Sequence, residues 1–228
     1  MNNASGKIHL IEKMIKNRQL DFIYLNETGT APGAYPLSEA VVYQVGHERK
    51  ENAGRYPYGH MILRNPDSTV LEQFIPITTT DPFLMAFKFK GRVFCGVYLK
   101  PLDNAMTESM ITKMSALLNI HREVIFIGDF NARHKSFGDH MSNHQGNTIL
   151  NWMKENCMQR AAPTSEEIFT FIRGNGRSIP DHIIHSERIE VAAEVDTESF
   201  IGDCDHRPLV GRTLAVSEER YRRNIFRG

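Results

Sequence analysis

Residues 123–132, EVIFIGDFNA, constrain the fold more than any other segment of the chain. Large apolar residues that follow one another without polar alternation predict a strand that is buried on both faces. Such a strand needs a layer of helices or a second sheet over each face. The run stops abruptly at Asp129 and Asn131, so this buried strand ends in side chains that can carry chemistry.

The remaining chain contains many predicted strands and few predicted helices. Apolar residues at helical spacing predict helices at residues 7–16, 106–118 and 145–156. Strand-like runs separated by Pro and Gly lie at residues 21–27, 39–46, 58–64, 69–77, 83–90, 92–99, 168–172, 179–185, 189–195 and 206–214. The helices are too few for a doubly wound parallel sheet. We therefore expect one α/β domain of mixed sheets with helices on their outer faces, with two packed sheets as one form of it.

Composition and cysteine usage narrow the class of protein. The 228 residues include 27 Lys+Arg, 27 Asp+Glu and 41% hydrophobic residues, which excludes disordered and collagen-like chains. Zero net charge argues against a uniformly basic surface but permits a local basic rim. Cys95, Cys157 and Cys204 form no C-x-x-C pair, so neither a disulfide framework nor a zinc ribbon is predicted. No secretion signal or bilayer-spanning segment is recognised, and we expect a nuclear protein, cytoplasmic before import.

Acidic and imidazole groups stand at the ends of four otherwise apolar strands. These groups are Glu27, Asp129 with Asn131, Asp181, and Asp205 with His206. A carboxylate at such a place loses hydration unless a cation or a donor meets it, so convergence of the four ends predicts a site for a hard divalent ion. Each group alone is better explained as a turn former at a strand end or as an exposed loop residue, and only the combination favours a site.

Four motifs in this order resemble the endonuclease/exonuclease/phosphatase superfamily: L-x-E-T at 25–28, G-D-F-N-A at 128–132, S-x-x-D-x-x-x-x-S at 178–186 and D-H-R-P at 205–208. The block GDFNARHKSFGD, followed by N-x-x-G, FTF and PDHIIHS, is most similar to the apurinic-type endonuclease domain of non-LTR (LINE-like) retrotransposons. The resemblance implies two packed mixed β-sheets flanked by helices, a DNase I-like four-layer sandwich, over residues 1–214. Residues 215–228 then form a basic tail or linker.

The resemblance also implies roles for single residues. Glu27 becomes the principal ligand of Mg²⁺ or Mn²⁺, with Asp205 near the metal and Asn2, or Asn3, as a remnant of the family's N-terminal Asn. In the same resemblance Asp129 orients or deprotonates the attacking water, and Asn131 binds the water or the phosphate. His206 contacts a phosphate oxygen, and Asp181 binds the other ring nitrogen of His206. Tyr98 and Thr170 lie at the scissile phosphate. Tyr98 is equally well explained as a packed aromatic at a strand end.

The implied reaction is phosphodiester hydrolysis that leaves a 3′-hydroxyl, which primes reverse transcription of a LINE-like element. The reverse transcriptase then lies downstream or in a partner. Candidate DNA contacts are Arg133, His134, Lys135, Arg173, Asn175, Arg177 and Arg207. The hairpin around residues 173–177 is the best of these, because two Arg around a Gly-Asn-Gly turn suit a narrow minor groove, although a solvated turn explains it as well.

Departures from the family pattern leave alternatives open. Cys204 stands where the family has Ser beside Asp-His, and Cys is a weaker donor. Lys135 and Phe137 replace a Pro and a Trp that are common in the LINE-type block. The alternatives are abasic-site repair, RNA deadenylation or phosphoinositide hydrolysis on the same fold, and a catalytically impaired DNA-binding module. We expect a monomeric domain.

Overall fold

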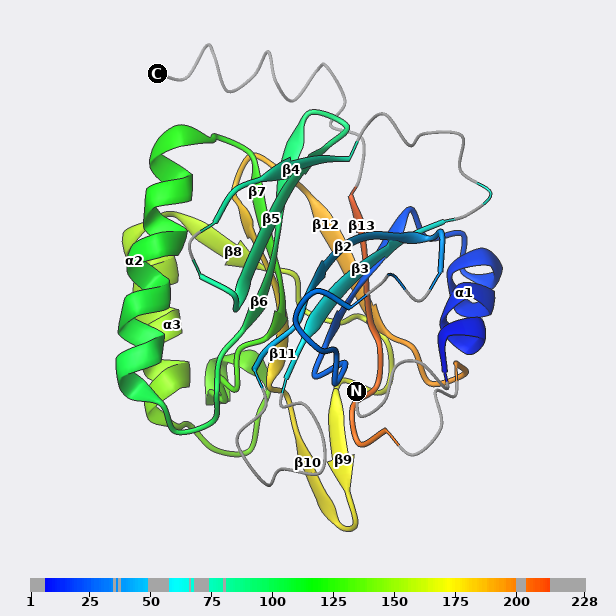
Figure 1. Ribbon diagram of the computed structural model, residues 1–228. Coiled ribbons are helices and arrows are strands. Elements are labelled where there is room, and N and C mark those ends of the chain that lie inside the picture. Colours follow the sequence, from blue (N-terminus) through cyan, green and yellow to red (C-terminus); the bar gives the residue numbers. More distant parts are fainter. Residues whose placement is uncertain are drawn as a thin grey trace, which may run out of the picture.

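The computed structural model describes residues 7–34, 36, 38–48, 58–65, 67, 74–79, 81–199 and 204–213 (Figure 1). The predictions for Asn2, Asn3 and residues 215–228 lie outside these ranges. The elements are α1 (Ile8–Asn17), β1 (Phe22–Asn26), β2 (Val41–Val45), β3 (His60–Arg64), β4 (Ile75–Ile77), β5 (Leu84–Phe89), β6 (Arg92–Tyr98), α2 (Asn104–Ile120), β7 (Val124–Asp129), the 3₁₀ turn η3 (Lys135–Phe137), α3 (His144–Glu155), β8 (Met158–Arg160), β9 (Phe171–Arg173), β10 (Gly176–Ser178), β11 (Asp181–Ser186), β12 (Val191–Val195) and β13 (Leu209–Thr213).

A six-stranded sheet with the order β4-β5-β6-β7-β11-β8 forms the centre of the molecule. Its one parallel pair is β6 with β7, and parallel neighbours need a crossover connection. Helix α2 is that crossover, and the Asp103 side chain caps it by accepting a hydrogen bond from the Met106 amide. Helices α2 and α3 together cover one face of the sheet (Figure 1).

The side-chain alternation of β7 separates two apolar layers. Val124 and Phe126 pack in the cluster that includes Met110 of α2 and Trp152 of α3. Ile125 points the other way, into the cluster that includes Phe94 and Ile62. Because side chains alternate across a strand, Asp129 lies on the same face as Ile125, away from the helices.

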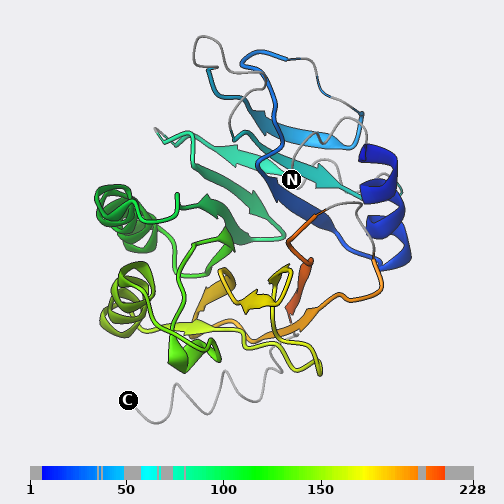
Figure 2. The ribbon, with the colours of Figure 1, turned by 90° about the horizontal axis from the view of Figure 1, so that it is seen from below.

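A second layer packs on this face. It contains the sheet β1-β3-β2 and the pair β12-β13, and the ring of Phe22 meets those of Phe87 and Phe94 edge to face at 5.1 and 5.0 Å. Helix α1 covers the outside, where Ile11 and Ile15 pack in a cluster with Leu25 and Val210 (Figure 2). The order is therefore helices, sheet, sheet, helix, and the predicted α/β architecture of packed mixed sheets is confirmed.

The two parts of the second layer leave a cavity between them. Among the described strands, β1 pairs only with β3, and β13 pairs only with β12. The cavity between their free edges has a volume of about 660 Å³, an apolar floor that includes Phe94, Ile125 and Ile183, and an end lined by Glu27 and Asp129. Glu27, Asp129, Asp181 and His206 therefore line one cleft whose floor is apolar.

The three expected helices form within two residues of their expected bounds. Some details differ from expectation. Residues 168–170 lie outside the strand, which begins at Phe171, and β8 was not expected. Of the run expected at 69–77, the described strand is Ile75–Ile77. Within the described chain, no helix combines the length and apolar character needed to cross a membrane.

Candidate active site

Three polar side chains form one row at the strand ends of the central sheet. Tyr98 ends β6 and is in register with Asp129, which ends β7 and is in register with Asp181 at the start of β11. Residues in register across a sheet project from the same face, so the three side chains stand next to one another. The predicted convergence of the apolar strand ends at Asp129 and Asp181 follows from this register.

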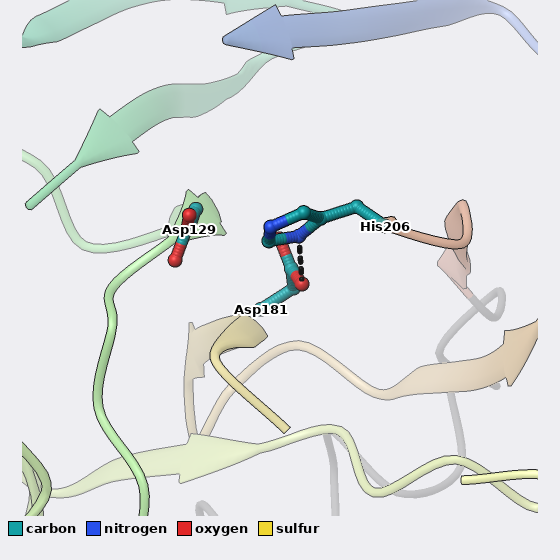
Figure 3. Close-up of side chains that lie close together, drawn as sticks. All are labelled: Asp129, Asp181 and His206. Atoms are coloured by element: carbon teal, nitrogen blue, oxygen red, sulfur yellow. Dashed lines mark hydrogen bonds and ion pairs between the residues drawn. The ribbon is translucent and has the colours of Figure 1, made fainter. Parts of the chain in front are cut away.

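His206 joins the row from the segment before β13. A backbone bridge to Phe171 fixes its position, and its Nδ1 donates a hydrogen bond to Asp181 Oδ2 at 2.9 Å (Figure 3). Figure 3 also shows the other ring nitrogen on the side of Asp129. One ligand atom from each of Asp129, Asp181 and His206 lies within 4.8 Å of the others.

Burial and mutual charge set the protonation of this group. Asp129 is 5% exposed, and its burial, together with the charge of Asp181, raises its pKa to about 7. Burial by itself disfavours the charged form of His206, but the charge and hydrogen bond of Asp181 outweigh it and raise the pKa to about 9. The site therefore contains an imidazolium and a carboxyl group that titrates near neutral pH.

Glu27 reaches the row from the second layer. The Tyr98 hydroxyl donates to Glu27 Oε1 at 2.7 Å, and burial raises the pKa of Tyr98, so the phenol stays protonated. Glu27 adopts a left-handed backbone, with φ of 52°. Residues other than glycine rarely adopt this conformation except where the surroundings enforce it, often at functional sites. The predicted grouping of Glu27 with Tyr98 is present in the geometry.

Asn131 is held in place from several directions. Its backbone amide donates to Asp129 Oδ1 at 2.9 Å, and its side-chain Nδ2 donates to the Leu99 carbonyl at 2.8 Å. Asn143 supports it by donating through Nδ2 to the Asn131 carbonyl at 2.7 Å. Asn131 has φ of 47°, a second left-handed residue at the site. The side-chain Oδ1 has no hydrogen-bond partner within the described chain and is available to a ligand.

The remaining predicted groups lie around this centre. Thr170 is fully buried, and its Oγ1 accepts a hydrogen bond from the Asp181 amide at 3.4 Å, which ties it to the catalytic row. The Asp205 side chain is 50% exposed and directed to Arg173, with its Oδ2 at 3.9 Å from Nε. It lies outside the cluster of Asp129, Asp181 and His206. Cys204 lines the cleft.

The candidate DNA contacts differ in their exposure and in whether a carboxylate already binds them. Arg173, Asn175 and Arg177 are exposed on the β9–β10 hairpin. The guanidinium of Arg133 instead forms a fork with buried Asp139, whose Oδ2 also accepts from the Ile179 amide. A phosphate would have to share Arg133 with this carboxylate, so its predicted DNA contact stays a prediction.

Two supporting residues had no signal in the sequence analysis. His182 donates through Nε2 to the Ala132 carbonyl at 2.7 Å and accepts from Arg160 Nε at 3.0 Å, and burial lowers its pKa to about 3. It therefore holds the segment after Asn131 as a neutral imidazole. Glu167 Oε2 accepts from Arg207 Nη1 at 2.9 Å and lies 3.5 Å from Arg177 Nη1. Both positions depend on long-range packing.

The donor set fits a hard divalent cation. Glu27, Asp129 and Asp181 each use one carboxylate oxygen within the site, in contacts with Tyr98, Asn131 and His206 respectively. Their second oxygens have no hydrogen-bond partner among the described residues. Carboxylate oxygens are the ligands that Mg²⁺ and Mn²⁺ prefer, whereas a protonated His206 cannot ligate a metal.

Comparisons with known proteins identify the family and the fold. Residues 92–210, just over half of the chain, match the family described as endonuclease-reverse transcriptase. No curated protein matches the sequence.

Several solved structures share the fold. They include a 3′ phosphatase, NExo, from Neisseria bound to a product DNA hairpin, with a TM-score of 0.71, 14% identity, and coverage of 94% of this chain and 96% of that chain. An AP endonuclease from Archaeoglobus fulgidus has a TM-score of 0.65 and 14% identity, with coverage of 93% of this chain and 96% of that chain. The endonuclease domain of TRAS1, a telomere-specific non-LTR retrotransposon, has a TM-score of 0.63 and 12% identity, with coverage of 90% of each chain. The chain belongs to the endonuclease-reverse transcriptase family and has the fold of the endonuclease/exonuclease/phosphatase superfamily.

Proposed function

We propose that this protein is a metal-dependent DNA endonuclease that nicks one strand of a target duplex. The observation that carries the proposal is the row of Tyr98, Asp129 and Asp181 completed by His206, which combines a base and a cation at one cleft. Phosphodiester hydrolysis needs these two groups, one to prepare water and one to meet the charge that develops on phosphorus oxygens.

Each residue has a role that its environment supports. Asp129, with a pKa near 7, orients and deprotonates the attacking water, and Asn131 holds the water or the phosphate. The His206 imidazolium contacts a phosphate oxygen, and Asp181 keeps it charged and oriented. Tyr98 fixes Glu27 and meets the scissile phosphate.

Glu27 is the principal metal ligand in this proposal, whereas Asp205 is left out of the metal site because its side chain points to Arg173 and lies outside the cluster. A bound Mg²⁺ or Mn²⁺ supplies Lewis acidity that stabilises charge on the leaving 3′ oxygen. The Glu27 oxygen without a partner and the neighbouring carboxylates support this assignment.

The product of the proposed reaction is a 3′-hydroxyl beside a 5′-phosphate. We infer that this 3′-hydroxyl primes reverse transcription of a LINE-like element, by a reverse transcriptase encoded in the same element. The family description and the likeness to a retrotransposon endonuclease domain support this inference. Such a protein works in the nucleus, where its target DNA lies.

Nicking of supercoiled plasmid with Mg²⁺ tests the proposal. The unchanged protein should convert supercoiled to open-circular DNA, EDTA should stop it, and Asp129→Ala and His206→Ala should each lower the rate by at least about 100-fold. Glu166→Gln, at an exposed position outside this row, is the control for altered charge. A rate for the unchanged protein no higher than that of the two variants refutes the endonuclease. A parallel assay on abasic and intact duplexes separates target nicking from abasic-site repair.

A further inference from the structure

A half-buried lysine stands beside the catalytic row without a catalytic role. Lys100 follows Tyr98 by two residues, and its carbonyl accepts from Gln145 Nε2 at 3.0 Å. The preceding carbonyl, of Leu99, accepts from the Asn131 side chain at 2.8 Å. The backbone of Lys100 is therefore fixed by the same hydrogen bonds that hold Asn131.

Two aromatic rings hold the Lys100 ammonium. Its Nζ lies 4.8 Å from the ring centroid of Tyr58 and 4.7 Å from that of Phe83. Both rings also meet Tyr98, at centroid distances of 5.6 and 6.0 Å. Tyr98 is 2% exposed, whereas Tyr58, Phe83 and Lys100 are half-buried. We call these three side chains the cation–aromatic shelf, and it continues the catalytic row toward the surface.

Within the described residues, the charge of the shelf has no carboxylate partner. Among the described residues Lys100 forms no ion pair, and the nearby carboxylate of Asp81 is bound by Lys113. Two other cations around the site have such partners: Arg133 pairs with Asp139, and Arg207 pairs with Glu167. A positioned cation that has no counter-charge among the described residues is suited to an anionic ligand.

The backbone under the shelf is strained. Tyr58 has φ of 57°, a conformation that a bulky side chain adopts only when neighbours enforce it. The enforcing contact is the Gly29 amide, which donates to the Tyr58 carbonyl at 2.7 Å, two residues beyond Glu27. The strained turn of the metal-binding candidate Glu27 and the strained Tyr58 thus hold each other, as expected where strain positions a functional side chain.

We propose that the cation–aromatic shelf binds the nucleotide next to the scissile phosphate, an inference that rests on the proposed DNA endonuclease function. The Lys100 ammonium contacts the neighbouring phosphate, and the part of the half-buried Tyr58 ring that reaches the surface stacks on the base of that nucleotide. Cations and aromatic faces together are the usual elements of a site for unstacked nucleic acid. Because every base has a π-face, this stacking subsite should bind all four bases without sequence preference.

The decisive variants separate the shelf from folding. Tyr58→Gly deletes the ring at a position whose φ glycine adopts freely, so relief of backbone strain offsets part of the packing that is lost with the ring. Lys100→Met removes the charge and keeps the length of the side chain, and Lys154→Met, on an exposed face of α3, is its matched control. Melting temperatures of all variants verify that each is folded.

Binding is measured by fluorescence anisotropy on a plasmid-derived duplex in EDTA, and KM and kcat by nicking with Mg²⁺. Lys100→Met should weaken binding about tenfold at low salt and reduce the slope of log K against log salt by about 0.9, with kcat nearly unchanged. Tyr58→Gly should weaken binding about 5- to 100-fold. Lys154→Met should bind as the unchanged protein does.

Substrates with single abasic positions beside the nick identify the stacked base. Removing that base should weaken binding by the unchanged protein and have no further effect on Tyr58→Gly. If the Tyr58→Gly and Lys100→Met variants are folded and still bind and nick DNA like the unchanged protein, the proposed nucleotide subsite is refuted. The proposed endonuclease activity is not affected by that result. An unchanged protein that neither binds nor nicks DNA refutes the proposed function itself.

Discussion

Asp181 Oδ2 accepts a hydrogen bond from His206 Nδ1 at 2.9 Å, and this contact keeps the imidazole of His206 protonated at neutral pH. The carboxylate comes from the start of β11 and the imidazole from the segment before β13. The buried Thr170 hydroxyl, which accepts from the Asp181 amide, fixes the carboxylate end. The pair thus determines both the charge and the direction of the second ring nitrogen.

Replacing Asp181 by Asn should lower the pKa of His206 from about 9 toward its ordinary value near 6.5. The carboxylate favours the imidazolium by charge and hydrogen bond, and the amide provides neither to the same extent. At pH 8 the variant imidazole is then mostly neutral. Histidine ring signals in an NMR pH titration, recorded in EDTA, measure the change directly. A His206 pKa that stays near 9 in the variant contradicts the assigned cause.

Replacing Asp129 by Asn should stabilise the fold at alkaline pH while it abolishes nicking. The folded-state pKa of about 7 lies above the unfolded value near 3.9, so the folded protein binds more protons between these values and loses stability as the pH rises through them. The amide keeps an oxygen for the Asn131 amide and carries no charge. We expect the free energy of unfolding to rise by about 1–4 kcal/mol at pH 8, and little at pH 4.5.

Urea unfolding in EDTA at both pH values measures this difference. Asp205→Asn is the matched control, because its side chain is 50% exposed and its carboxylate should change the unfolding free energy by no more than about 0.5 kcal/mol. An Asp129→Asn protein that is less stable than the parent at pH 8 would show that ionised Asp129 is well solvated.

Glu167 should weaken DNA binding by competing with phosphate for Arg177. Its Oε2 lies 3.5 Å from Arg177 Nη1 and accepts from Arg207 Nη1 at 2.9 Å. Glu167→Gln should therefore bind duplex DNA several-fold more tightly in 50 mM salt and steepen the slope of log K against log salt by about 0.9, the contribution of one phosphate contact. Anisotropy titrations in EDTA measure both quantities.

Glu166→Gln makes the same change in net charge one residue away, at an exposed position. It should raise the affinity less and leave the salt slope unchanged. Weaker binding by Glu167→Gln than by the parent would mean that Glu167 positions the β9–β10 hairpin and does not compete with DNA.

The parts of the site that follow from local pattern were predictable, and those that follow from packing were not. Asp129 and Asp181 could be grouped because each stands at one terminus of an apolar run, and neighbouring buried strands bring such termini together. Glu27 and Tyr98 meet only because two sheets face each other, and sequence indicated that meeting through family resemblance alone.

The shelf shows why the rest could not be read from the sequence. Tyr58, Phe83 and Lys100 come from three separate segments, and neither ring–cation contacts nor a strained backbone leave a periodic trace. His182 looked like one more residue of an apolar strand, yet its two ring nitrogens bind Ala132 and Arg160. Motifs in the sequence predict the candidate reacting groups, whereas the groups that position them become visible only in the tertiary structure.

Gly128 of the G-D-F-N-A motif should be irreplaceable for steric reasons. It has φ of 145°, and a Cβ there would lie 2.0 Å from the Val97 carbonyl oxygen. The neighbouring backbone belongs to β6, which is hydrogen-bonded to β7 and cannot move away without breaking the sheet. Gly128→Ala should therefore lower the free energy of unfolding by more than about 3 kcal/mol.

Gly174→Ala is the matched control for this change. Gly174 also has a positive φ, 57°, but nothing lies within 4 Å of its Cβ position on the exposed hairpin. Its replacement should reduce the free energy of unfolding by only about 1 kcal/mol, the conformational part of the effect. Urea unfolding of the two variants under one condition compares them. Equal losses would mean that backbone conformation, and not the contact with Val97, explains the glycine of this motif.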